Sequence, residues 1–295
     1  MENYMNNIPL VSVIIPFYNE KENQVRRAID SILNQTYLYI EIVIVLDNPN
    51  NMLIDSIVNR YVETCNNINY LKNSENIGIS GTRNIAISIS NGKYIAYNDG
   101  DDYSHPTRIE KQVNFLEKHL DVDVCGAGLI WRDESNPNFS FRTLDKRPFE
   151  ESIKFVCPVP NPTFITRKVN FYNFGIYNPN LRKSEDFDLM VRWFVKGAVF
   201  ENINDYLVDY YRDMSGSNSR ISEETWLGTK IRLKYRKVLK LNLSNYIKIF
   251  LYDIPFFILL PRFVVNKLVF LKNRLFQNYL NLATLMLVYS IKNWF

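Results

Sequence analysis

An acidic turn at residues 98–102 has the clearest potential for chemistry in this chain of 295 residues. It reads Asn98-Asp99-Gly100-Asp101-Asp102 and directly follows the short apolar run at 94–97. Two carboxylates two positions apart on a turn, here Asp99 and Asp101, can converge on one divalent cation. Such a cation can bridge a diphosphate and neutralise the charge that develops on it as a leaving group.

Two simpler interpretations of the turn stay open at this point. Asn/Asp-Gly is typical of a two-residue hairpin turn, and the segment could also be a solvated acidic loop. Against the hairpin, residues 106–120 place Ile109, Val113 and Leu116 at helical spacing, so a helix rather than a pairing strand is expected next. A pair of aspartates alone is weak support for a metal site, because the pattern recurs by chance.

The elements around this turn alternate between strand and helix. Apolar, β-branched runs predict strands at 10–16, 40–46, 68–71, 94–97 and 122–131, and helical periodicity predicts helices at 23–33, 52–62, 80–90 and 106–120. This alternation indicates βαβ units and a parallel sheet covered on both faces. Ligand sites in such sheets lie beyond the carboxyl ends of the strands, where the acidic turn falls. Further strands are predicted at 161–166, 199–202 and 206–211, and a helix at 185–196.

Composition excludes several classes of protein. With 46% hydrophobic and 22% charged residues, the chain is neither disordered nor collagen-like. Three scattered cysteines predict reduced, buried thiols rather than a disulfide framework, and two histidines exclude a histidine-rich metal centre. Residues 1–9 show neither the basic nor the apolar region of a secretion signal.

Charge is distributed unevenly along the chain. Residues 226–295 contain twelve basic residues and one acid, a balance of +11, so the net charge of +4 leaves −7 for residues 1–225. The basic, apolar region 222–295 predicts helices that bind an anionic membrane surface. Residues 275–291 are uncharged, but 17 residues are marginal for a span. A helical subdomain packed on the body, or a homo-oligomer interface, is the alternative. Nucleic acid is disfavoured because the basic residues lie among apolar ones.

A series of short motifs, in order, resembles the family 2 glycosyltransferases over roughly residues 10–212. The motifs are VIIPFYNE at 13–20, AIDSILNQT at 28–36, NIG at 76–78, TRN at 82–84, GKYIA at 92–96, DGDD at 99–102, PTR at 106–108, EKQ at 110–112 and SEDFDL at 184–189. The resemblance implies the α/β GT-A fold, with a mixed, mostly parallel central sheet flanked by helices. It implies a domain over 1–221, with a nucleotide-binding half at about 1–105 and an acceptor half at 106–221, followed by the helical extension 222–295. The implied reaction is sugar transfer from a nucleotide donor with inversion.

The resemblance also assigns the donor side of a site. It implies that Asp99 and Asp101 are ligands of Mn²⁺ or Mg²⁺ and that Asp102 is a supporting carboxylate. It also implies that Asp47 binds the base or ribose. The other residues implied to contact or flank the nucleotide are Pro16, Tyr18, Asn19, Glu20, Arg83 and Arg212. A guanidinium suits this task because it is always charged and donates two hydrogen bonds at once. Without the resemblance, Arg83 would be interpreted as a surface arginine paired with an acid.

The acidic pair Glu185-Asp186 matches the position of the catalytic base. An inverting transfer needs a carboxylate to take the proton of the acceptor hydroxyl, and we assign this role to Asp186. The simpler interpretation is that Ser184 caps a helix and the acids complement its dipole. Both interpretations can hold together.

Two departures from the family pattern bear on the donor. Leu46 stands where the family often has a first aspartate before Asp47, which leaves the choice of nucleotide open. Met214 stands where a histidine often follows the segment Tyr211-Arg212. Asp213 or the loop 215–217 is the candidate substitute.

The leading hypothesis is a glycosyltransferase of surface polysaccharide synthesis, peripheral on the cytosolic face of a bacterial membrane. Its donor would be a nucleotide sugar, with a UDP-sugar favoured, and its acceptor a lipid-linked or saccharide hydroxyl. One alternative is a weakly active or inactive scaffold that keeps the fold and binds a glycan. A second is a sugar-nucleotide nucleotidyltransferase, although segment 17–22 lacks the glycine expected of such an enzyme.

Overall fold

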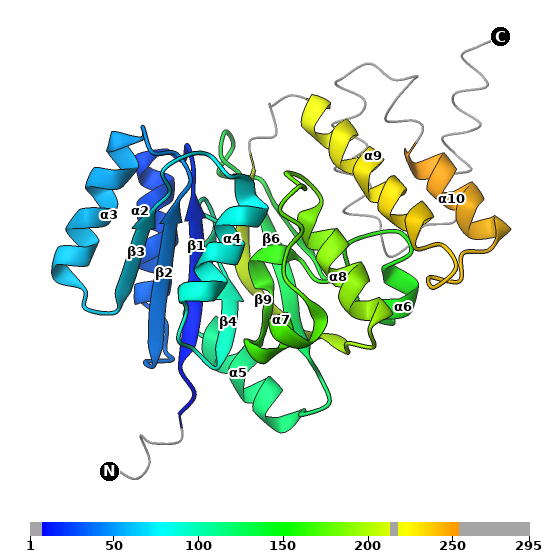
Figure 1. Cartoon of the computed structure of the whole chain (residues 1–295), viewed down its shortest axis with the longest axis horizontal. Helices are drawn as coiled ribbons and strands as arrows, with labels where there is room; N and C mark the ends of the chain where they lie inside the picture. The colour runs from blue at the N-terminus through cyan, green and yellow to red at the C-terminus, as the bar shows by residue number, and fades with distance from the viewer. Residues whose placement is uncertain (1–7, 213–217, 254–295) are drawn as a thin grey trace.

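The computed structural model describes residues 8–212 and 218–253, and one large sheet runs through it (Figure 1). The order of its strands is β3-β2-β1-β4-β8-β6-β9-β5, with β7 paired to β6. Strands β1 to β4 are parallel neighbours, whereas β8 runs antiparallel to both β4 and β6. The strands are β1 (Val11–Phe17), β2 (Ile40–Leu46), β3 (Ile68–Lys72), β4 (Tyr94–Tyr97), β5 (Tyr103–Ser104), β6 (Val124–Asp133), β7 (Ser140–Thr143), β8 (Ile165–Arg167) and β9 (Phe200–Arg212).

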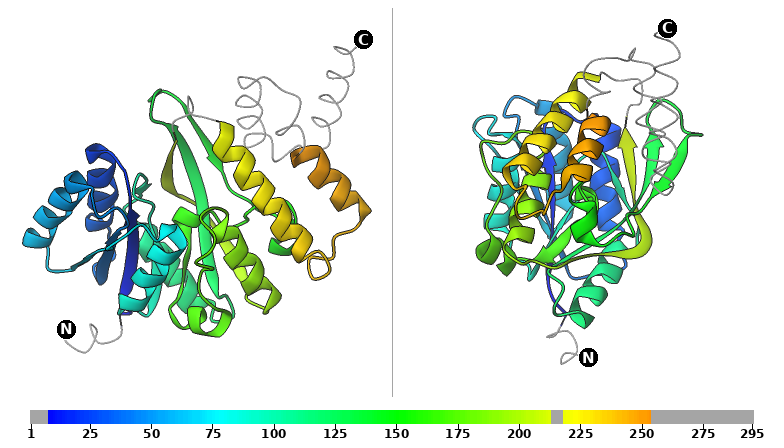
Figure 2. Two further views of the ribbon diagram at one scale, coloured as in Figure 1. Left: turned by 45° about the horizontal axis from the view of Figure 1, so that its top comes forward. Right: turned by 90° about the vertical axis from the view of Figure 1, so that its right-hand side faces the viewer.

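Helices cover both faces of this sheet, as the two views of Figure 2 show. They are α2 (Glu22–Leu33), α3 (Met52–Thr64), α4 (Gly78–Ile89), α5 (Arg108–Lys118), α6 (Phe149–Ser152), α7 (Val169–Phe174), α8 (Glu185–Val195), α9 (Asn218–Lys234) and α10 (Leu243–Asp253), with a 3-10 helix η1 (Asn161–Thr163). Alternate residues of β1 face opposite layers, so Val13 and Ile15 pack with α2, α3 and α5, and Ile14 packs with α4, α7 and α8. The prediction of a mixed α/β sheet buried on both faces is confirmed.

The parallel strands and their helices lie where the sequence predicts them, and the second half differs in detail. Residues 161–166, predicted as a strand, form η1 and then β8, because Pro162 has no N–H to donate to a ladder. The strands predicted at 199–202 and 206–211 are one strand, β9, which keeps its pairing to β6 through irregularities beside Gly126 and Gly128. Short elements such as β5 and β7 were not predicted, since a few residues carry no periodicity.

Helix α9 shares a core with α8. Ile231 of α9 and Leu239 beyond it pack with Ile153, Phe187 and Val191. The described part of the basic region is therefore packed on the body by one face. Within residues 8–212 and 218–253, we find no helix with the length and apolarity that crossing a membrane requires. The predicted amphipathic segment 275–291 lies outside the described residues.

Candidate active site

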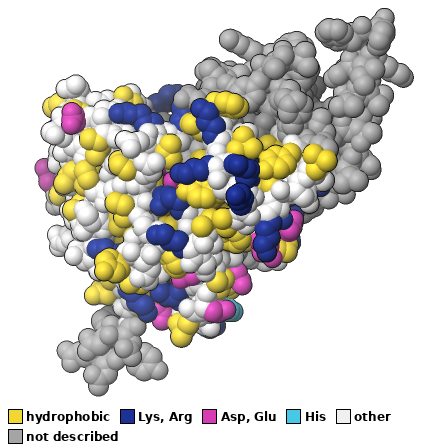
Figure 3. Space-filling view, turned by 45° about the vertical axis from the view of Figure 1, so that its right-hand side comes forward, with side chains coloured by type: hydrophobic (Ala, Val, Ile, Leu, Met, Phe, Trp, Pro, Cys, Tyr) yellow, Lys and Arg dark blue, Asp and Glu magenta, His cyan; other side chains and the backbone are white. Residues whose placement is uncertain are grey.

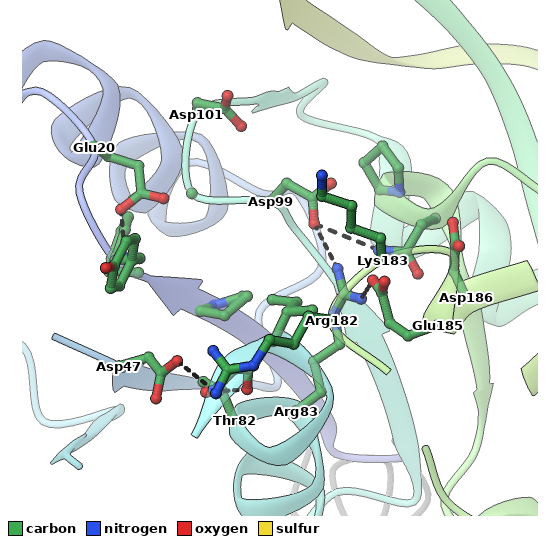
Figure 4. A pocket seen from close by; sticks show the side chains of 18 of the residues that line it. Glu20, Asp47, Thr82, Arg83, Asp99, Asp101, Arg182, Lys183, Glu185 and Asp186 are labelled. Carbon is green, nitrogen blue, oxygen red and sulfur yellow. Dashed lines mark hydrogen bonds and ion pairs between the residues drawn. The ribbon is translucent and has the colours of Figure 1, made fainter. Parts of the chain in front are cut away.

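A cavity of about 620 Å³ opens beyond the carboxyl ends of the parallel strands, and it is lined from both halves of the sheet (Figure 4). This volume is in the range of small-molecule and cofactor sites. Asn19 and Asp102, which the resemblance also implies, are not among the residues that line the cavity. The other ten residues predicted for the site lie on its wall: Pro16, Tyr18, Glu20, Asp47, Arg83, Asp99, Asp101, Glu185, Asp186 and Arg212. The fold thus brings together residues that are up to about 200 positions apart in the chain.

A buried arginine binds the residues on either side of the acidic turn. Arg108, fully buried at the start of α5, donates to the carbonyl of Tyr97 at 2.6 Å and to the hydroxyl of Ser104 at 2.6 Å. That hydroxyl donates to Asn98 Oδ1 at 2.7 Å, which fixes the first residue of the turn. After the turn, β5 pairs with β9 and not with β4, so the hairpin interpretation is wrong.

Gly100 lets the turn approach the end of β1. A Cβ at this position would lie 2.7 Å from Phe17 Cδ1 and 2.9 Å from the carbonyl oxygen of Pro16. Neither distance is compatible with a side chain, so glycine is required by close approach. This contact places the aspartates next to the strand end that also carries Tyr18 and Glu20.

The carboxylates around the turn oppose each other's ionisation. Burial, then the charge of Asp99, raises the pKa of Asp101 to about 6. Burial also raises the pKa of Glu20 to about 7, assisted by the charges of Asp101 and Asp99. The pKa of Asp102, which accepts a bond from the Tyr211 N–H, is raised well above its usual value, chiefly by burial.

This acid cluster suits a divalent cation. Hard cations prefer carboxylate oxygens, and Mg²⁺ is commonly held by one or two carboxylates together with substrate phosphates. Asp99 and Asp101 provide such a pair on the cavity wall. Among the residues that the structure describes, no group of three or more His, Cys, Asp or Glu side chains has the arrangement of a metal centre.

Arg83 joins the acidic turn to helix α8. Its side chain is buried, with Nη1 2.5 Å from Glu185 Oε1 and Nη2 3.2 Å from Asp99 Oδ1. The guanidinium lies 5.5 Å from the ring centroids of both Tyr97 and Tyr177. Burial acts to lower the pKa of Arg83, but Tyr177, Glu185 and Asp99 outweigh it and the pKa lies above its usual value. The interpretation as a surface arginine is therefore wrong, although the pairing with acids is present.

Asp186 is held differently from its neighbour Glu185. Its Oδ1 accepts the N–H of Phe187 at 2.7 Å, and burial together with the charge of Glu185 raises its pKa to about 7, against the opposing charge of Arg83. Ser184 stands before α8 with a left-handed φ of 53° and makes no side-chain capping bond. The helix start is thus fixed by backbone and ion pair, and the predicted serine cap bond is not formed.

Asp47 ends β2 beside the first turn of α4. Oδ1 accepts from Asn73 Nδ2 at 2.8 Å and from the Ile77 N–H at 3.0 Å, and Oδ2 accepts from the Gly78 N–H at 2.9 Å. Leu46 before it is fully buried in the core, so the departure from the family pattern removes a carboxylate from the interior of the sheet.

The remaining predicted residues lie around the mouth of the cavity. The Tyr18 ring is 45% exposed, and its N–H donates to Glu20 Oε2 at 2.7 Å. Arg212 lies 5.0 Å from the ring centroid of Tyr210, and its charge lowers the pKa of Asp101. Met214 and the candidate substitutes for the histidine fall at 213–217, outside the described residues.

Arg182, Lys183 and Asn161 are among the wall residues that were not predicted to contact the donor. Arg182 Nη1 donates to Asn76 Oδ1 at 2.9 Å, and Lys183 follows it directly on the same wall. Asn161 of η1 lies 3.4 Å from Asp99 Oδ1 through its Nδ2. The basic pair just before Glu185-Asp186 was visible in the sequence, but its position over α4 depends on the fold.

Comparison with known proteins agrees with this geometry. The sequence profile of "Glycosyl transferase family 2" matches residues 12–178. "Uncharacterized glycosyltransferase MJ1057" of Methanocaldococcus jannaschii is 30% identical over 282 residues, which cover 90% of this chain and 94% of the relative. "UDP-Glc:alpha-D-GlcNAc-diphosphoundecaprenol beta-1,3-glucosyltransferase WfaP" of Escherichia coli is 32% identical over 221 residues, or 71% of this chain and 80% of WfaP.

Solved structures share the fold. S. aureus TarS 1-349 in complex with UDP-GlcNAc superposes with a TM-score of 0.60 at 19% identity, over 83% of this chain and 71% of that one. A longer TarS structure matches with a TM-score of 0.60, and there the chain spans 44% of the TarS length. The TarS likeness supports the predicted GT-A architecture. With the profile matched over more than half of its length and a 30% identical relative matched almost end to end, the chain belongs to glycosyl transferase family 2.

Proposed function

We propose that this glycosyltransferase moves a sugar, with inversion, from a UDP-sugar to a hydroxyl of a lipid-linked or saccharide acceptor in surface polysaccharide synthesis. One observation carries the proposal: Asp99 and Asp186 lie on one cavity wall and are connected through Arg83 and Glu185. A metal-binding carboxylate and a carboxylate of raised pKa are the two groups that such a transfer needs. The names of WfaP and of the TarS complex support the choice of a UDP-sugar and a lipid-linked acceptor.

The proton transfer falls to Asp186. Arg83 Nη1 lies 2.5 Å from Glu185 Oε1, and this ion pair holds the Glu185 carboxylate in place. Asp186, with a pKa raised to about 7 by burial and by Glu185, is poised to accept a proton near neutral pH. The acceptor oxygen attacks the anomeric carbon as Asp186 takes its proton, and the bond from that carbon to the diphosphate breaks with its electron pair going to the UDP oxygen.

The donor is held on the other side of the cavity. Asp99 and Asp101 would hold Mn²⁺ or Mg²⁺, which supplies positive charge to the leaving diphosphate. Asp47 accepts from the base or ribose, and Pro16 with the exposed ring of Tyr18 offers a surface for the nucleoside. Arg212 contributes positive charge on the side of Asp101.

We place the enzyme at an anionic membrane, on its cytosolic face. On α9, Trp226, Lys230 and Lys234 are exposed at four-residue spacing, opposite the face that packs on α8, and Lys237 is exposed just beyond the end of the helix. Lys230 Nζ lies 5.1 Å from the Trp226 ring. Figure 3, which turns the α9 and α10 side forward, shows Lys/Arg and hydrophobic side chains interleaved there. Basic and aromatic side chains on one helix face suit anionic headgroups. The same face is unsuited to a homo-oligomer interface, because the positive charges of two copies would repel each other.

A donor panel tests the proposed reaction. Thermal shift is measured with UDP-, GDP- and TDP-sugars, each with and without Mn²⁺, followed by radiolabel transfer from the stabilising donor to lipid extracts. We expect stabilisation by a UDP-sugar that increases with Mn²⁺, and label in the lipid fraction. Binding without transfer would favour the scaffold alternative, and no shift with any donor would overturn the proposal.

A further inference from the structure

Arg182 has a fixed place at the nucleotide end of the cavity. Its Nη1 donates to Asn76 Oδ1 at 2.9 Å, and the hydroxyl of Ser80 donates to the carbonyl of Leu181 just before it. The Arg182 side chain packs against Gly78. A Cβ built at Gly78 would lie 3.4 Å from Arg182 Cγ and 3.6 Å from Arg182 Cζ. Gly78 has a φ of +80°, a backbone conformation that favours glycine.

The same glycine joins Arg182 to Asp47. The Gly78 N–H donates to Asp47 Oδ2 at 2.9 Å, so the guanidinium and the carboxylate pack against one residue, and Figure 4 shows both at the same end of the cavity. A carboxylate offers about four lone-pair positions. Contacts from described residues fill three on Asp47, two of them on Oδ1 and one on Oδ2. One acceptor position on Oδ2 is left for a ligand.

We propose that Arg182 is a specificity-determining residue that reads the nucleobase together with Asp47 and selects a pyrimidine-2,4-dione, that is, uracil or thymine. This inference rests on the proposed function and deepens it. The edge of such a base presents one N–H donor at N3 flanked by two carbonyl oxygens. The single free position of Asp47 accepts the N3–H. Arg182, a guanidinium with five N–H donors of which Asn76 takes one, donates to the 4-carbonyl, which cytosine replaces with an amino group.

Cytosine and guanine are expected to bind more weakly than uracil at Asp47 and Arg182. Cytosine carries a lone pair at N3, which would face the Asp47 carboxylate. Guanine presents two adjacent donors, N1–H and the 2-amino group, to a carboxylate with one free position, and an unpaired donor in a buried site is costly. A base of the wrong kind binds weakly because it leaves the Asp47 carboxylate or the Arg182 guanidinium without a hydrogen-bond partner.

Calorimetry with UDP, CDP and GDP on the full chain in Mn²⁺ tests the proposal. The unaltered protein should bind UDP at least about tenfold more tightly than CDP or GDP, the worth of one charged hydrogen bond. Arg182→Met should weaken UDP binding about tenfold and leave CDP binding unchanged, so the preference for UDP over CDP falls about tenfold to the part that Asp47 imposes. Arg26→Met, the same change on the exposed face of α2, is the matched control and should bind all three nucleotides as the unaltered protein does.

Inorganic pyrophosphate, measured by competition against UDP, separates base reading from phosphate binding. Unchanged pyrophosphate affinity in Arg182→Met supports the proposal. Equal losses for UDP, CDP and pyrophosphate would overturn it and make Arg182 a phosphate ligand. Tight UDP binding without preference over CDP in the unaltered protein would overturn the base reading alone. Failure to bind any of the three nucleotides would overturn the proposed function as well.

Discussion

The guanidinium of Arg83 binds Glu185 across 102 positions of sequence, with Nη1 2.5 Å from Oε1. Its other terminal nitrogen lies 3.2 Å from Asp99 Oδ1, so one side chain of α4 connects the end of β4 with the start of α8. The acidic turn and the start of α8 are thereby held to each other on the cavity wall. Arg83 acts here as a positioning residue, and this gives a different expectation from a residue that only binds the nucleotide.

Arg83→Met should destabilise the protein by about 3–5 kcal/mol, because Glu185 would stay buried without its cation. Urea unfolding followed by circular dichroism measures this change. The double variant Arg83→Met/Glu185→Gln removes both charges and should lose less free energy of unfolding than the single variant. Equal losses for the two variants would show that the ion pair contributes nothing beyond packing.

Asp186→Asn should lower kcat by at least about 100-fold while UDP affinity stays unchanged, since the amide keeps the shape but accepts no proton. Transfer kinetics measures kcat, and calorimetry measures the affinity for UDP. Glu185→Gln is the comparison, and it should act mainly on stability through the lost pairing with Arg83. Near-normal turnover of Asp186→Asn would assign the base elsewhere.

The acid limb of kcat/KM should follow the raised pKa of Asp186. Burial and the charge of Glu185 raise this pKa to about 7, so the carboxyl is protonated below that pH and cannot act as a base. We expect activity to fall about tenfold per pH unit below neutrality and to level off above about pH 8. Asp186→Asn should lose this limb from its residual activity, and a persisting limb would contradict the assignment.

Asp101→Ala should abolish the Mn²⁺-dependent part of UDP binding, because one of the two carboxylates proposed to hold the cation is removed. Calorimetry with UDP, with and without Mn²⁺, measures it. Asp205→Ala is the matched control, since Asp205 lies outside the cavity in an exposed pair with Lys111. If Asp101→Ala binds UDP with full Mn²⁺ dependence, the paired aspartates do not form the metal site.

Gly100→Ala should cost about 1–3 kcal/mol of unfolding free energy and weaken UDP binding. The added Cβ would lie 2.7 Å from Phe17 Cδ1, and the acidic turn must move to relieve the clash. Gly228→Ala in α9 is the control, because its nearest contact would be 3.4 Å, to a flexible arginine side chain. Identical stability and UDP affinity in Gly100→Ala would mean that the turn tolerates displacement.

Reversing charge at Lys230, Lys234 and Lys237 to glutamate should release the protein from phosphatidylserine vesicles. Each lysine near an anionic surface contributes about 1 kcal/mol, so removing three lowers binding more than 100-fold. Co-sedimentation with phosphatidylserine and with phosphatidylcholine vesicles measures it. Arg60→Glu, on the exposed face of α3, should leave binding unchanged. Equal sedimentation of the triple variant would exclude this face as the membrane contact.

The apolar runs and ordered motifs of the chain are sufficient to predict the parallel half of the sheet and the acidic turn. Strands β2 and β4 have their predicted bounds because each is a mostly apolar run, and the pattern of such a run is local. The ordered motifs also placed Asp47, Asp99 and Glu185-Asp186 at strand ends and a helix start, where side chains of a parallel α/β sheet meet.

The contacts of these side chains depend on the packing of segments that are far apart in the chain. The partners of Arg83 lie 16 and 102 positions away, and Arg182 reaches an asparagine 106 positions away, distances that no local pattern encodes. Burial then set the chemistry: Glu185 and Asp186 are adjacent carboxylates in the sequence, but the fold gives Arg83 to one and leaves the other with a pKa raised to about 7. Desolvation and long-range pairing, which depend on the packed chain, therefore separate the acid that pairs with Arg83 from the acid that we propose as the base.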